Sequence, residues 1–144
     1  MLNHGSINLH QTFISPKWLV FDYNIKCIQC CKDTSMPLSK TDIKRIESLG
    51  YSYDFFVDTH DGWFQLKNRD GHCVFHNGMK CLIYEHRPEG CQLYPIIFDK
   101  ENNCAILDEE CPYRTKFLIT RSSRKKLFHL VSKIESERFY RMSL

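Results

Sequence analysis

The sequence has 144 residues, of which 42% are hydrophobic, 26% are charged and 13% are aromatic. This composition is typical of one globular domain with a modest core, and it argues against a disordered or fibrous chain. The net charge of +3 is uneven, because residues 113–144 hold nine Lys or Arg and two Glu (net +7), whereas residues 1–112 hold eleven and fifteen (net −4). We therefore predict a cysteine-rich body, residues 1–112, with a basic helical extension, residues 113–144, packed on it.

The first 21 residues lack a basic start followed by a long apolar run, so we expect no secretory signal. No apolar run approaches the roughly 20 residues that span a bilayer, so we expect no membrane contact and a cytoplasmic location. Residues 18–26, WLVFDYNIK, are rich in aromatic and β-branched types. They predict a strand that leads into Cys27.

A helix is predicted after Ser39, which has the side chain of an N-cap. Asp42 stands three residues further on, in the position that completes a capping box. Ile43, Ile46 and Leu49 then fall at helical spacing, and Gly50 can end the helix in a left-handed conformation.

Three short strands are predicted in the middle of the chain, separated by two turns. They are residues 63–67, 72–76 and 81–84, with turns at Asn68–Gly71 and Asn77–Gly78. Cys73 and Cys81 therefore flank one tight hairpin, which would bring their thiols close together.

The chain then alternates between helix and strand signals. Pro88 suits the first turn of a short helix that contains Cys91 and ends at Tyr94-Pro95. Residues 96–107 predict a strand pair that turns at Asn102–Asn103.

From Pro112 onward the pattern predicts helix, with a bend near Thr120–Ser123 and Ser122 or Ser123 as the cap. An apolar stripe at helical spacing follows, made of Leu127, Leu130, Val131 and Ile134. The predicted fold is therefore a small α+β domain, with short hairpins and a few helices around a cysteine-ligated metal site and a helical C-terminus.

Eight cysteines carry the clearest chemistry: Cys27, Cys30, Cys31, Cys73, Cys81, Cys91, Cys104 and Cys111. In a reducing compartment such a set favours metal or redox chemistry over disulfides. Buried free thiols are the alternative, but three cysteines within five residues fit it badly. Cys27 and Cys30 form a C-x-x-C pair, whose spacing lets both sulfurs turn onto one metal. Cys31 follows directly, so it shares that centre only if the backbone turns there.

The order of these motifs resembles the CxxCxxCC cysteine-cluster family, whose description implies chelation of zinc or iron. The resemblance runs from about Tyr23 to Pro112, through CIQCC, GHCVF and CLIYEHRPEGCQLYP. It implies six ligand positions, Cys27, Cys30, Cys31, Cys73, Cys81 and Cys91, and Cys111-Pro112 resembles a late Cys-Pro of many members. The family motif has a further cysteine three residues before Cys27, where this sequence has Asn24.

Zinc and iron–sulfur centres both use four thiolates, so the ligand type does not separate them. The adjacent cysteines and the Cys-Pro pair favour an iron–sulfur cluster. Cys104 and Cys111 complete the set of candidate ligands. We rank first a metal-binding module that carries, stores or senses the metal, and second a redox or metal-dependent enzyme or electron carrier.

A third hypothesis is a protein that docks on RNA or an acidic protein partner through its basic helix. Its densest charges are Arg121, Arg124, Lys125 and Lys126, which could equally form a solvated helix face. Other residue types give weaker signals. His72, His76 and His86 could be ligands or donors to sulfur but also suit ordinary turns. Arg87 could neutralise thiolate charge or pin a loop, and turn chemistry explains Asp58, Asp61 and Asp70 better than catalysis does.

Overall fold

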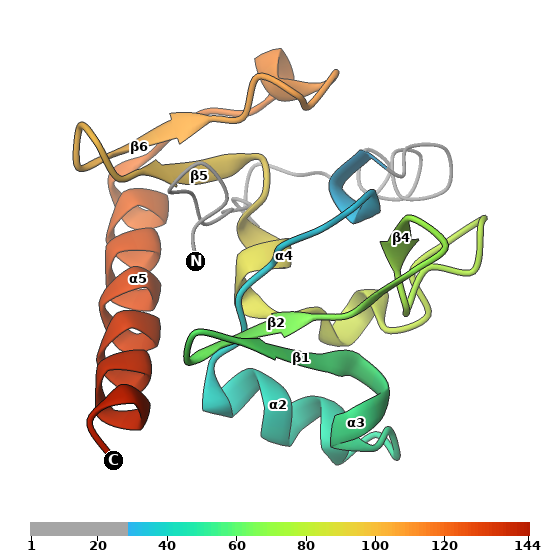
Figure 1. The fold of residues 1–144 in the computed structure, drawn as a ribbon. Coiled ribbons are helices and arrows are strands. Elements are labelled where there is room, and N and C mark those ends of the chain that lie inside the picture. Colours follow the sequence, from blue (N-terminus) through green and yellow to red (C-terminus); the bar gives the residue numbers. More distant parts are fainter. Residues whose placement is uncertain (1–28) are drawn as a thin grey trace.

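The computed structural model describes residues 29–144, so the predicted strand at residues 18–26 and Cys27 lie outside the described residues. The described chain is a small α+β domain with short antiparallel hairpins and a helical C-terminus (Figure 1). None of its helices is long and apolar enough to cross a bilayer.

Helix α2, Lys40–Glu47, begins where the capping signal predicts. Ser39 Oγ accepts a hydrogen bond from Asp42 N at 3.0 Å, and Asp42 Oδ2 accepts one from Ser39 N at 3.1 Å. Ile43 and Ile46 are buried, and Gly50 follows with a φ of 105°, which confirms the predicted stop.

The short helix α3, Tyr53–Phe56, leads into a hairpin of β1, Val57–His60, and β2, Trp63–Leu66. Asp61 and Gly62 form its turn, both with positive φ. Strand β2 was predicted, but β1 was not. Only the first residue of β1 is buried, so its sequence lacks the alternation that signals a half-buried strand.

A second, shorter hairpin joins β3, Asn68–Arg69, to β4, His72–Cys73, across the predicted turn. The chain before it is fixed against this hairpin, because Lys32 bridges His72 and Asp33 N donates to Gly71 O at 2.9 Å. This bridge holds the 3-10 turn η1, Gln29–Cys31, close to β4.

The prediction of strands at residues 72–76 and 81–84 was wrong in extent. Strand β4 ends at Cys73, and beyond it the two segments share only one bridge, His76 to Cys81. Tyr84 N donates to Cys81 O and His86 N to Ile83 O. These local bonds curl the chain into the 3-10 helix η2, Tyr84–His86, and end the pairing.

The C-terminal half follows the predicted order more closely. Helix α4, Glu89–Leu93, precedes a hairpin of β5, Ile96–Asp99, and β6, Cys104–Leu107. After the 3-10 turn η3, Arg114–Lys116, the chain ends in α5, Arg121–Met142. Its N-cap is Thr120 rather than Ser122 or Ser123, because Ser123 supplies the other half of a capping box.

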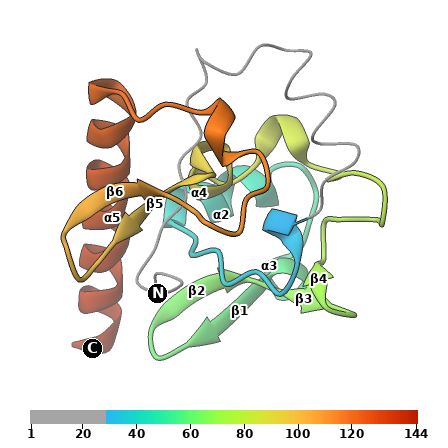
Figure 2. The same cartoon turned by 90° about the horizontal axis from the view of Figure 1, so that it is seen from above.

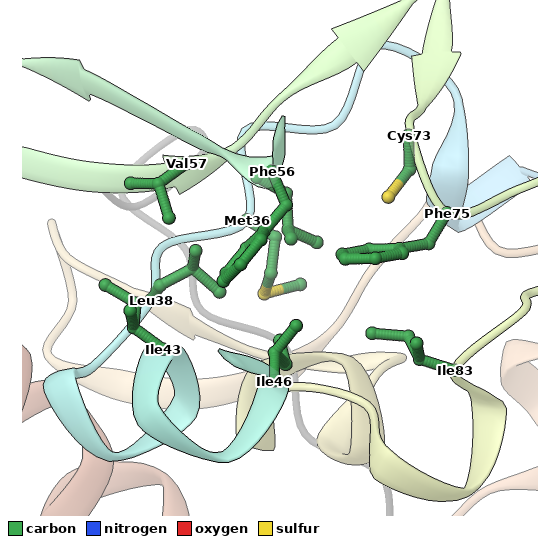
Figure 3. Close-up of a cluster of buried hydrophobic side chains, with 10 residues drawn as sticks. Met36, Leu38, Ile43, Ile46, Phe56, Val57, Cys73, Phe75 and Ile83 are labelled. Atoms are coloured by element: carbon green, nitrogen blue, oxygen red, sulfur yellow. The ribbon is translucent and has the colours of Figure 1, made fainter. Parts of the chain in front are cut away.

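Two hydrophobic clusters lie on the two sides of α4. The first joins α4, β5 and α5 through seven buried residues: Leu93, Ile96, Phe98, Leu127, Leu130, Val131 and Ile134. Figure 2 shows α5 running beneath the β5–β6 hairpin on one side of the molecule. The second, which we call the thiol-side cluster, joins α2, β1, β2 and the segment from Cys73 to Ile83 around Phe56 and Phe75 (Figure 3). The division of the chain at residue 112 stays a prediction.

Candidate metal centre

Four cysteines from four separate segments lie at the thiol-side cluster, and Cys30 is the sequence neighbour of one of them. Cys30 and Cys31 come from η1, Cys73 from β4, Cys81 from the turn after it and Cys91 from α4. Cys73 belongs to the cluster, with its sulfur directed inward beside Phe75 (Figure 3), and Cys31, Cys81 and Cys91 pack against it. The described cysteines Cys30, Cys31, Cys73, Cys81, Cys91 and Cys104 carry free thiols.

Burial makes these thiols hard to ionise in the metal-free protein. It raises the pKa of Cys73 to about 12, and the charges of Cys81 and Cys30 add to the effect. Burial likewise raises the pKa of Cys81 and, more strongly, that of Cys91. An apolar environment disfavours an unpaired thiolate, so a bound cation would be needed to hold these groups ionised.

The charges of four thiols act on one another: Cys30, Cys73, Cys81 and Cys91. In each of their six pairs, the charge of one thiol raises the pKa of the other. The charges of Cys30, Cys91 and Cys73 also act on Cys31. Repulsion of this kind reports that the groups lie within Coulombic range of one another. The set therefore has the number and type of donors that a zinc ion or an iron–sulfur cluster requires.

Cys31 has a different role from its neighbour. Its hydrogen bond to Cys30 is the largest cause of its raised pKa, and the same bond is the largest cause that lowers the pKa of Cys30. Burial of the Cys30 thiol opposes this lowering, although the residue as a whole is exposed. The Cys31 thiol is thus placed to donate an S–H···S hydrogen bond to Cys30, which favours ionisation of Cys30 over that of Cys31.

Backbone amides also support two of the sulfurs. The pKa values of Cys73 and Cys81 are raised overall by burial. A hydrogen bond from the backbone of Phe75 opposes this rise at Cys73, and one from Ile83 opposes it at Cys81. In both cases the donor is two residues after the cysteine. N–H donors that point at sulfur stabilise the ionised form, which is the form that binds metal.

The positive charge of Arg87 acts on several of these groups. Its guanidinium favours the ionised form of Cys30, and at Cys81 and Cys91 it opposes the larger effect of burial, which raises the pKa. The guanidinium also stacks on the Tyr84 ring at 3.8 Å. Arg87 Nε donates to Tyr84 O at 2.9 Å, so the same side chain also pins η2. The predicted loop-pinning role of Arg87 is therefore present, and its role beside a metal centre stays a prediction.

The three histidines near the site differ in their surroundings. His86 is exposed in η2, and His72 Nδ1 lies 3.3 Å from Asp70 O. His76 is buried, and its Nδ1 accepts a hydrogen bond from Gly78 N at 3.0 Å. Its Nε2 atom is buried without a hydrogen-bond partner.

The other candidate ligands lie elsewhere. Cys104 begins β6 opposite Asp99, on the hairpin that packs against α5. Cys111 is buried. The pKa of Tyr94 is raised mainly by burial, and the charges of Asp108, Cys111 and Cys30 add to the effect. Within residues 29–144, no three His, Cys, Asp or Glu side chains already form a group that could hold a metal ion.

The aspartates considered for catalysis and the basic residues considered for partner binding lie in turns, on an exposed strand position or on an exposed helix face. Asp61 and Asp70 occupy turn positions with positive φ, and Asp58 is exposed on β1. The cations from Arg121 to Lys126 are exposed on α5, whereas Phe128 packs edge-on against Phe98 at 5.6 Å. The Phe128 side chain near the basic cluster thus serves packing.

Comparison with known families agrees with this arrangement. Residues 24–112 match the model of the CxxCxxCC family, described as "Putative zinc- or iron-chelating domain". The chain belongs to this family. The match includes η1, β4, the turn at Cys81 and α4, and so every segment that contributes a thiol to the set of four. No curated protein and no solved structure gave a match.

Proposed function

We propose that this CxxCxxCC protein is a metal-binding module that holds one zinc ion or iron–sulfur cluster through Cys30, Cys73, Cys81 and Cys91. The observation that carries the proposal is that Cys73 lies in the thiol-side cluster with Cys81 and Cys91 packed against it, so that three thiols from three segments meet there. The mutual charge effects among these three thiols and Cys30 support it. Soft thiolate donors select zinc and iron–sulfur clusters over hard cations such as magnesium or calcium. When bound, the metal or cluster would supply the positive charge that makes four buried thiolates stable together.

The other cysteines have supporting places in this proposal. Cys31 donates its S–H to Cys30 and packs against the thiol-side cluster, so it orients a ligand rather than being one. Cys111 and Cys27, the latter outside the described residues, remain candidate ligands, and Cys104 is assigned no ligand role. The module would work in the reducing cytoplasm, where thiols stay available to metal.

The role that fits best is to carry, store or sense the metal. Binding would draw together segments that are far apart in sequence, from residue 30 to residue 91, and would release protons from thiols with raised pKa values. The protein would therefore respond in both fold and charge to the presence of metal. These are the properties of a binding module, and they require no substrate.

The test is anaerobic purification with metal, iron and sulfide analysis and a visible spectrum. We expect one zinc per chain and a colourless protein, or iron and sulfide with broad absorption near roughly 400 nm. Single Cys→Ser changes at positions 30, 73, 81 and 91 should each abolish stoichiometric loading. Cys104→Ser is the matched control, because it removes a described thiol outside the set. Loading that survives the changes at positions 73 and 91 would refute the proposed ligands.

A further inference from the structure

His76 is the one buried histidine of the described chain, and its hydrogen bonding is incomplete. Because Nδ1 accepts from Gly78 N at 3.0 Å, the ring proton of the neutral imidazole is on Nε2. This Nε2–H group is buried and has no acceptor. An unsatisfied buried donor is costly to keep, which indicates that an acceptor arrives in another state of the protein.

The backbone places His76 directly opposite Cys81. The bridge between them is antiparallel, and its two hydrogen bonds flank the pair: Leu82 N donates to Phe75 O at 2.8 Å, and Asn77 N donates to Lys80 O at 3.1 Å. His76 and Cys81 are therefore a non-hydrogen-bonded pair, the kind in which opposite side chains lie on one face and approach most closely.

We infer that His76 is a positioning residue that donates its Nε2–H to the Cys81 sulfur once that sulfur is a metal-bound thiolate. A neutral thiol is a weak acceptor, whereas a thiolate is a strong one, so the bond forms only when metal is present. The inference rests on the proposed function, in which Cys81 is a ligand. It gives the buried donor its missing partner and gives the metal centre a donor from outside the ligand set.

Cadmium-113 tests this bond directly, because a proton in an N–H···S–Cd bond shows scalar coupling to the metal in NMR spectra. We would load the full-length protein with one equivalent of cadmium-113. The expected result is a slowly exchanging His76 Nε2–H resonance coupled to cadmium, alongside the coupling of the Ile83 amide proton. An Ile83 coupling without a His76 coupling would overturn this inference and leave the proposed function standing. A protein that binds no cadmium would overturn both.

Two substitutions separate the two ring nitrogens. His76→Asn keeps an acceptor for Gly78 N but removes the distal donor, whereas His76→Gln keeps a distal N–H. We expect His76→Asn to weaken cadmium and zinc affinity by about 10- to 100-fold in chelator competition, with binding still one to one. His76→Gln should restore most of the affinity, and His129→Asn, at an exposed position on α5, is the control and should leave it unchanged. Equal losses in both His76 variants would show a packing role only and would overturn the inference.

Discussion

Asp42 allows a quantitative test of how the helices are held around the thiols. It is fully buried, and its Oδ2 atom accepts from Ser39 N at 3.1 Å. Its Oδ1 atom accepts from Glu89 N at 3.1 Å and from Arg45 Nη2 at 3.2 Å. One carboxylate therefore caps α2 and also fixes the start of α4, the helix that contains Cys91. Asp42→Ala removes all of these bonds without adding bulk.

The expected cost follows from the groups that lose their acceptor. Each backbone N–H left unsatisfied in the interior costs about 1–3 kcal/mol. The Ser39 amide is fully buried and the Glu89 amide belongs to a half-buried residue, so we take about 2 and about 1 kcal/mol respectively. The pair with Arg45 adds less than about 1 kcal/mol, because that side chain is 31% exposed. The free energy of unfolding should fall by about 3 kcal/mol, out of a total of about 5–15 kcal/mol.

Urea unfolding of the metal-loaded protein, followed by far-UV circular dichroism, measures this change. With a slope of about 1–3 kcal/mol per molar urea, the midpoint should fall by roughly 1–3 M. Asp58→Ala, at an exposed position on β1, is the matched control and should change stability by less than about 0.5 kcal/mol. A loss below about 1 kcal/mol in Asp42→Ala, or one equal to the control, would refute the reasoning.

Three further predictions concern the metal centre. In the metal-free protein the pKa of Cys73 is raised from 9.0 to about 12, so its neutral thiol stabilises the fold below pH 9. That stabilisation is lost as the pH rises toward 12, so the urea midpoint should fall over this window, and less so in Cys73→Ser. Arg87→Gln should weaken zinc affinity roughly 10-fold in chelator competition, while Arg114→Gln leaves it unchanged. Equal zinc affinities of the two variants would show that Arg87 does not stabilise the bound metal. Metal removal should speed amide exchange at Phe75 more than at Leu130, and an unchanged melting temperature would contradict the coupling of metal to folding.

Local signals in the sequence were enough to predict several elements. The capping box at Ser39 and Asp42 needs only four consecutive residues, and α2 begins there. The apolar stripe from Leu127 to Ile134 is buried as predicted, because helical spacing alone places it on one face of α5. Strand β1 and the end of β4 could not be predicted in the same way, since they depend on pairing partners rather than on their own residues.

The candidate site was predictable as a list of cysteines but not as a geometry. Spacing could not separate Cys30 from Cys31, because adjacent residues differ only in which way the folded backbone turns them. Cys104 was one of the eight predicted candidate ligands, yet its place on β6 follows from the strand pairing that puts it opposite Asp99. The importance of His76 was also hidden, since its unpaired nitrogen results from a bridge to Cys81 that no local pattern encodes.

Helix α4 explains why the metal centre and the fold should be inseparable. A helix of five residues is too short to be stable alone, so its position depends on its neighbours. Asp42 holds its first amide, Lys133 of α5 reaches Glu89 at 3.7 Å, and Leu93 is buried in the cluster beneath β5 and α5. Cys91, on the same helix, packs instead against the thiol-side cluster. A metal bound at Cys91 would therefore be connected to both hydrophobic clusters through α4. Binding or loss of the metal should then change the stability of both clusters in the described domain.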